Sequence, residues 1–116
     1  MIRNLHQLVS GPEMLAAYLN MNNDGRIKTF DAVLAQWHEK PDVESLRSGD
    51  RSEWQDRKAA AMRELRRLVM TFGRVSMYYA NLADAPNRRI PAEECRKLSA
   101  GYRSFAGALS AALDEA

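Results

Sequence analysis

Oxygen-bearing side chains recur over a short stretch near the N-terminal end of the chain. Carboxylate and amide oxygens are supplied by Asn20, Asn22, Asp24 and Asp31, and Gly25 directly follows the third of these residues. Such oxygens are the ligands that calcium prefers, and a glycine permits the sharp turn that brings several of them to one ion. The residue types and their spacing therefore predict a candidate metal site formed by these four side chains.

The same segment, residues 20–31, resembles the twelve-residue calcium loop of EF-hand and dockerin modules. Its oxygen side chains fall at loop positions one, three, five and twelve, with glycine at position six. Three positions depart from the family pattern: Asn20 replaces an aspartate, Lys28 stands at position nine, and Asp31 is shorter than the usual glutamate. Two carboxylates beside a lysine supply little negative charge, so we expect no calcium binding tighter than millimolar. A calcium-binding helical protein is therefore the second alternative function.

Residues that commonly carry catalysis are few and separated. His6 and His38 are the only histidines, and the HxxxH and HExxH spacings of zinc sites are absent. Glu93 and Glu94 are adjacent, so they point about 100° apart on a helix. Cys95 lies on an apolar stripe, which is typical of a buried and unreactive thiol. We therefore expect no enzyme activity and no cofactor.

Basic residues are concentrated in the second half of the chain. Residues 1–50 contain five Lys or Arg against seven Asp or Glu, whereas residues 51–116 contain twelve against eight. Most of these basic residues are arginine, which suits bidentate contacts to phosphate or carboxylate. A small nucleic-acid-binding regulator is therefore the main alternative function. The side chains that would bind the nucleic acid are Arg63, Arg66, Arg67, Arg88 and Arg89.

A DNA-binding helix-turn-helix over residues 12–38 is a related interpretation. Small and apolar residues, among them Leu15, Ala16 and Leu19, occupy positions that such a motif requires. The connection between the two predicted helices is longer than the usual three to four residues, however, and this half of the chain is net acidic. Both features argue against this motif.

One long helix is expected to position the arginines. Residues 50–82 contain no proline, and Asp50 with Glu53 fits a capping box at the start. Apolar residues recur at alternating spacings of four and three, which places them on one stripe. These residues are Ala61, Leu65, Leu68, Phe72, Val75, Tyr79 and Leu82. Because Met70, Met77 and Tyr78 add apolar side chains on other faces, the second half is predicted to be covered on several sides.

The C-terminal part predicts a second long helix over residues 91–114. Pro91 suits the first helical position, and a stripe of apolar residues begins at Cys95. A short loop between two long helices predicts an antiparallel hairpin, with Cys95 beside Tyr79. Shorter helices are expected near residues 12–20 and 29–40, the second capped by Thr29, with single turns before Ser10 and at 42–47.

Nothing in the chain alternates as a strand would, so the predicted fold class is all-α. We expect a compact bundle of four or five helices around the long central helix, forming a single domain of residues 1–116. No stretch is apolar enough for a membrane span, and the N-terminal residues lack the pattern of a secretory signal. One cysteine cannot form an internal disulfide. A cytoplasmic protein without membrane association is expected.

Trp54 is the residue that most strongly suggests a partner. It lies on the apolar stripe of the long helix but among charged neighbours, and the hairpin places it beyond the end of the C-terminal helix. An apolar stripe left uncovered is commonly satisfied by a second copy or by another protein. We therefore predict a partner-binding site or homodimer contact centred on Trp54, with Arg51, Arg57 and Lys58 around it.

These observations together predict a non-catalytic helical protein-binding module. Large aromatic and adaptable methionine side chains are typical of protein interfaces. In size, helical content and lack of a catalytic motif, the chain resembles the small inhibitors made by phages and mobile elements, anti-CRISPR proteins among them. This resemblance rests on no shared motif, and it implies an inhibitor of a host protein complex.

Overall fold

The computed structural model describes residues 2–23, 25–38, 48–87 and 89–115, without the side chains of residues 48 and 50. This part of the chain is helical and contains no strand, which confirms the all-α prediction. Its elements in order are the 3-10 helix η1 (Leu5–Leu8) and the α-helices α1 (Gly11–Asn23), α2 (Ile27–His38), α3 (Ser48–Ala83) and α4 (Ala92–Asp114). None of the described helices combines the length and the apolar character that a membrane-spanning segment needs.

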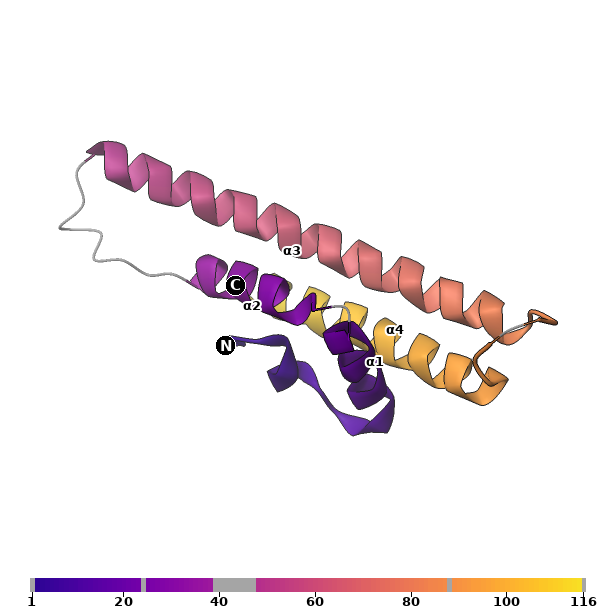
Figure 1. Cartoon of the computed structure of the whole chain (residues 1–116). Coiled ribbons are helices and arrows are strands. Elements are labelled where there is room, and N and C mark those ends of the chain that lie inside the picture. The colour runs from indigo at the N-terminus through magenta and orange to yellow at the C-terminus, as the bar shows by residue number, and fades with distance from the viewer. Residues whose placement is uncertain (1, 24, 39–47, 88, 116) are drawn as a thin grey trace.

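The 36 residues of α3 set the shape of the molecule. At 1.5 Å per residue such a helix is about 54 Å long, and the whole protein measures 60 × 24 × 21 Å. Figure 1 shows α4 running antiparallel beside α3, while α3 continues past the C-terminal end of α4. The predicted hairpin is therefore present, and Ser76 faces Ser99 across it, in agreement with the predicted placement of Cys95 beside Tyr79.

The predicted apolar stripes form the core between these two helices. On α3 the side chains of Ala61, Leu65, Leu68 and Phe72 are buried. Phe72 lies 5.7 Å from Phe105 of α4 between ring centroids. The further buried members of the α4 stripe are Cys95, Leu98, Tyr102 and Leu109. Burial of these side chains is the main stabilising contribution to the hairpin.

The two shorter helices cover different sides of the hairpin. α1 packs against α4, and α2 packs against α3. Leu34 and Trp37 are buried on the inner side of α2, and Leu5 of η1 is fully buried. The backbone N–H of Leu5 donates to the Asp31 carboxylate at 2.9 Å, which ties the N-terminal segment to α2.

Two local expectations were wrong. α1 continues to Asn23 rather than ending near Asn20, and α2 begins at Ile27, so Thr29 lies inside the helix instead of capping it. The turn between them depends on Gly25, whose φ of +70° is open to glycine and strained for other residues. The helical turn expected at 42–47 lies outside the described residues.

The third correction concerns the second half of α3. It was expected to be covered on several sides, but Met70, Met77 and Tyr78 are exposed. The reason is the placement of the short helices: α1 lies on α4 and does not cover this side of α3. One face of α3 is consequently open to solvent.

Candidate functional site

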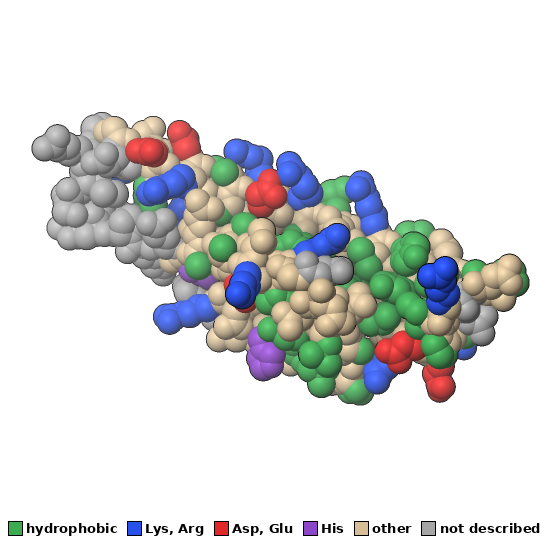
Figure 2. All heavy atoms as spheres, viewed as in Figure 1, with side chains coloured by type: hydrophobic (Ala, Val, Ile, Leu, Met, Phe, Trp, Pro, Cys, Tyr) green, Lys and Arg blue, Asp and Glu red, His purple; other side chains and the backbone are tan. Residues whose placement is uncertain are grey.

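The open side of α3 carries large apolar side chains together with arginines. We call this surface the outer face of α3 and define it as Arg63, Arg67, Met70, Arg74, Met77 and Tyr78, all of which are exposed. Met70, Met77 and Tyr78 have exposed fractions of 60%, 66% and 60%. Figure 2 shows basic side chains in a row along α3 with hydrophobic side chains between them. Large apolar side chains grouped in this way are typical of interaction surfaces.

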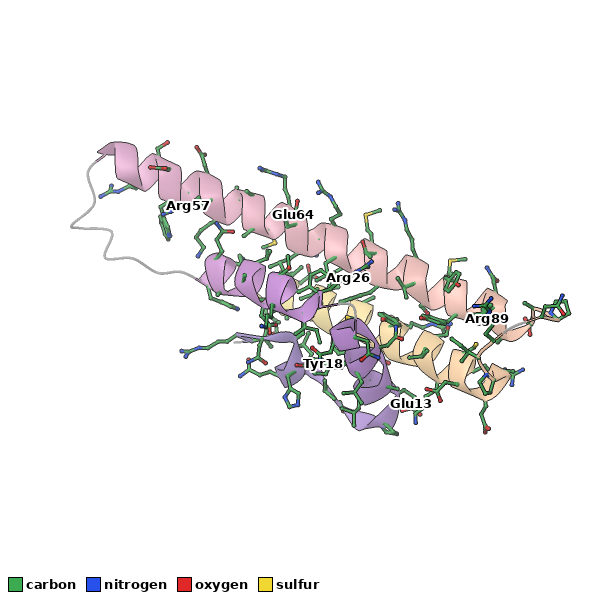
Figure 3. All side chains as sticks on the ribbon, viewed as in Figure 1. Glu13, Tyr18, Arg26, Arg57, Glu64 and Arg89 are labelled. Carbon is green, nitrogen blue, oxygen red and sulfur yellow. The ribbon has the colours of Figure 1, made fainter. Side chains whose placement is uncertain are left out.

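The helix itself dictates this grouping. Residues 63, 67, 70, 74 and 77 follow the same alternation of four and three as the buried stripe, on the opposite side of the helix. Leu68 and Phe72 point into the core, so Met70 and Arg74 must point away from it. In Figure 3 the side chains along the upper side of α3 project away from the other helices.

The electrostatic character of the outer face is positive. No Asp or Glu occurs in α3 between Leu65 and Ala83. Arg67 forms a 2.7 Å ion pair with Glu64, but both side chains are more than half exposed, at 71% and 53%. Such surface pairs contribute about 0–1 kcal/mol. Among the described residues, Arg74 has no carboxylate partner, so this face has an unneutralised guanidinium between two methionines.

A groove between α2 and α3 borders the outer face. Its volume is about 250 Å³. Phe30, Val33 and Leu68 line it with apolar side chains, and its charged lining consists of Arg26, Arg67 and Glu64. Figure 3 labels Arg26, the residue directly before α2, below the middle of α3. The groove therefore extends the apolar and basic surface from α3 onto α2.

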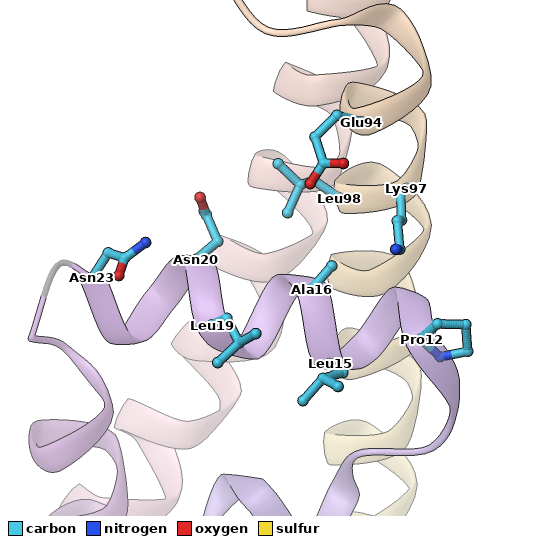
Figure 4. A pocket seen from close by; sticks show the side chains of 9 residues that line it. All are labelled: Pro12, Leu15, Ala16, Leu19, Asn20, Asn23, Glu94, Lys97 and Leu98. Atoms are coloured by element: carbon cyan, nitrogen blue, oxygen red, sulfur yellow. The ribbon is translucent and has the colours of Figure 1, made fainter.

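A second groove lies where α1 crosses α4, with a volume of about 370 Å³. Leu15 and Leu19 line it and are 44% and 52% exposed. Figure 4 shows Glu94 and Lys97 of α4 on one side of α1, with Leu15 and Leu19 on its other side. This groove carries both signs of charge, unlike the outer face of α3.

The residues predicted around Trp54 share the N-terminal part of α3. Trp54 is half-buried, and the Nζ of Lys58 lies 5.3 Å from the centroid of its indole ring. Its Nε1 is buried, and none of the described residues accepts its hydrogen bond. Arg51 and Arg57 are exposed. Because Asp114 pairs with Arg66 at 2.8 Å, the end of α4 falls short of Trp54, as predicted.

The arginines predicted to bind nucleic acid do not form one patch. Arg63, Arg66 and Arg67 are exposed near the middle of α3. Arg89 is exposed in the loop after the helix, and Figure 3 places it at the far end of the hairpin. Arg88 lies outside the described residues. From Arg67 to the end of α3 the helix rises about 24 Å, so Arg89 is separate from the other three.

The predicted calcium ligands have other structural roles. Asn20 and Asn22 lie in α1, and Asp31 lies in α2. The Asn20 amide donates to the hydroxyl groups of Tyr102 at 2.8 Å and Tyr79 at 3.2 Å, and the Asp31 carboxylate accepts from Leu5. Asp24 lies outside the described residues, so its predicted role as a calcium ligand is not tested.

The short connection between α1 and α2 also corrects an argument about DNA binding. Only residues 24–26 separate the two helices. A longer connection, unsuited to a helix-turn-helix, was expected because α1 was predicted to end near Asn20. Connection length therefore no longer opposes that interpretation, although the acidic balance of this half remains.

Metal-binding clusters are absent from the described part of the chain. No three His, Cys, Asp or Glu side chains there lie close enough to hold a metal ion. His6 is exposed and stacks edge-on against Tyr18, with 5.3 Å between the ring centroids. Cys95 is buried, and its thiol lies 3.8 Å from the Ile90 carbonyl oxygen.

No protein-family model, curated protein or solved structure matches the chain. The function is therefore argued from its own residues, and the outer face of α3 is the strongest candidate site. Arg74, Met70 and Met77 belong to none of the sites predicted from the sequence. The signal that identifies them is the second alternation of fours and threes on α3, opposite to the buried stripe.

Proposed function

We propose that this chain is a non-catalytic protein-binding module that acts through the outer face of α3. The observation that carries the proposal is the exposure of Met70, Met77 and Tyr78 on one side of a helix. Burying such side chains against a partner removes apolar surface from water at about 25 cal/mol per Å². A rigid helix loses little conformational freedom when it binds, so more of this gain is available for affinity.

The residue types support a protein as the partner. Methionine adapts its shape to an irregular surface, and tyrosine provides a large contact with a polar tip. Methionine, tyrosine and arginine are all enriched in protein interfaces. Arg67 and Arg74 beside the methionines supply directional hydrogen bonds at the edge of an apolar contact.

Inhibition of a host protein complex, in the manner of the small proteins of phages and mobile elements, is the finer form of this proposal. It rests on size and helical content. Identification of the partner tests the inhibitor proposal, because we expect such an inhibitor to bind where its target binds substrate or a subunit.

Site-specific photo-crosslinking tests the proposed surface. A photoreactive phenylalanine derivative replaces Met70 or Met77, and the exposed α4 residue Ala111 is the control position. In cells of the native host we expect a discrete protein adduct from positions 70 and 77 and none from position 111. Absence of a protein adduct at both α3 positions would refute the module.

Nucleic-acid binding is the second candidate function, favoured by the three-residue connection between α1 and α2. Arg26 and Lys28 are exposed at the start of α2, where a helix-turn-helix reads DNA. Binding to random duplex DNA should then weaken steeply with salt and weaken further in Arg26→Ser/Lys28→Ser. Salt-independent or undetectable binding would exclude this function.

A further inference from the structure

The outer face of α3 has the repeat of a coiled-coil seam. Arg67, Met70, Arg74 and Met77 follow each other at spacings of three and four, which are the a and d positions of a heptad. Arg67 and Arg74 occupy a, and Met70 and Met77 occupy d. Each pair is two helical turns apart, about 10.5 Å along the axis. All four side chains are exposed, so the seam is open to a further helix.

The arginines at the a positions determine what can pair with this seam. An a-position side chain faces the partner helix and loses water when the two helices meet. An arginine in that position requires a carboxylate, because a buried charge without a partner opposes binding. Glu64 pairs with Arg67 through an exposed contact, which a partner's carboxylate can replace.

A second copy of the chain does not meet this requirement. It would bring the same arginines, and the stretch of α3 from Leu65 to Ala83 has no acidic residue to pair with them. Like charges brought together across an interface oppose association. The seam therefore favours a different protein.

A nucleic acid also fits the seam poorly. Met70 stands between Arg67 and Arg74, so a phosphate backbone following the arginines would press its charged oxygens against methionine. Phosphates bind best to a continuous line of cations, whereas Arg67, Met70, Arg74 and Met77 alternate cation and apolar side chain. A helix that alternates carboxylate and apolar side chain matches it better.

We propose that the outer face of α3 binds an acidic amphipathic helix of another protein. Its Asp or Glu side chains, seven residues apart, pair with Arg67 and Arg74, and its apolar side chains cover Met70 and Met77. This inference rests on the proposed function and adds the chemistry of the partner to it.

A displayed library of helices tests the pairing chemistry. The library contains helices of about three heptads whose a and d positions vary among Glu, Lys, Leu and Ser. It is selected against the full chain, against Arg67→Glu/Arg74→Glu, and against Arg96→Glu/Arg103→Glu. The last variant changes the net charge equally, at the same spacing, on exposed positions of α4.

The native chain should select helices with Glu opposite the arginines and Leu opposite the methionines. The α3 variant should select Lys in place of Glu and bind the original helices at least about tenfold more weakly. The α4 variant should behave as the native chain does. Equal selection of Glu and Lys, no enrichment at all, or displacement of the helices by random duplex DNA would each overturn the inference.

The two proposals fail in different ways. A protein adduct at Met77 in cells, combined with no preference for Glu in the library, would overturn the acidic helix and leave the binding module intact. Absence of any adduct would refute the module whatever the library selects. Thermal unfolding of each variant confirms that these exposed substitutions leave the fold intact.

Discussion

Ser76 and Ser99 join α3 and α4 through a reciprocal pair of hydrogen bonds. The Ser76 hydroxyl donates to the backbone carbonyl of Ser99 at 2.7 Å, and the Ser99 hydroxyl donates to the carbonyl of Ser76 at 2.8 Å. Both residues are buried, with exposed fractions of 3% and 5%. Small side chains at this point let the two helices approach closely, and the paired bonds fix their relative position along the axis.

Replacing either serine should weaken the hairpin. Ser76→Ala or Ser99→Ala removes one buried hydrogen bond and is expected to lower the free energy of unfolding by about 0.5–1.5 kcal/mol. Chemical denaturation measures the effect, with Ser104→Ala on the exposed side of α4 as the control. The double variant should depart from additivity because the hydroxyl groups lie 3.2 Å apart. A loss at Ser104 equal to that at Ser76 would contradict the role of the pair.

Gly101 lies where α1 crosses α4, and a methyl group there would overlap the Glu13 carbonyl and crowd Ala17. Alanine normally stabilises a helix interior by up to about 1 kcal/mol relative to glycine. At Gly101 the overlap should dominate, and Gly101→Ala should destabilise by about 1–3 kcal/mol.

Gly107 on the same helix is the matched control, since a methyl group there meets no atom within 4 Å. Gly107→Ala should therefore be neutral or stabilising. Chemical denaturation of the two variants compares them directly. Equal stabilisation in both would show that α1 does not press on α4 at Gly101.

Much of the helical framework follows from the sequence, because apolar periodicity and turn residues are local signals. The stripe from Ala61 to Phe72 is buried as predicted, and the hairpin has the expected orientation. The exposure of Met70 and Met77 could not be predicted from apolar periodicity. Apolar residues on a second face of a helix indicate that this face is buried against another element. Whether α1 or α2 buries it depends on where these helices pack, which the local sequence pattern does not show.

The candidate sites were less predictable for a related reason. Asn20 and Asp31 have the spacing of metal ligands, yet Asn20 donates to Tyr102, and Asp31 accepts from Leu5. These partners are 82 and 26 residues away along the chain. Hydrogen bonds over such separations leave no local pattern in the sequence.

Self-association through Trp54 remains a prediction that sedimentation can test. The indole N–H is buried without an acceptor among the described residues, and such a group costs about 1–3 kcal/mol when it is unsatisfied. Trp54 is only half-buried and lies beyond the end of α4, so the exposed part of its ring is open to a second copy. We expect a dimer at micromolar concentration that becomes monomeric in Trp54→Ala and persists in Met77→Ser, which lies on the outer face. A monomeric native chain would exclude the dimer.

The final prediction separates a structural role of Asp31 from a calcium-binding one. Its carboxylate accepts the N–H of Leu5 at 2.9 Å, and Leu5 is fully buried. Asp31→Ala should therefore lower the free energy of unfolding by about 0.5–2 kcal/mol, with or without calcium. Millimolar calcium should change the stability of the native chain little, because the segment contains only two carboxylates and also a lysine, Lys28. Denaturation in calcium and in chelator measures both effects. Stabilisation by micromolar calcium that is lost in Asp31→Ala would make the segment a calcium site instead.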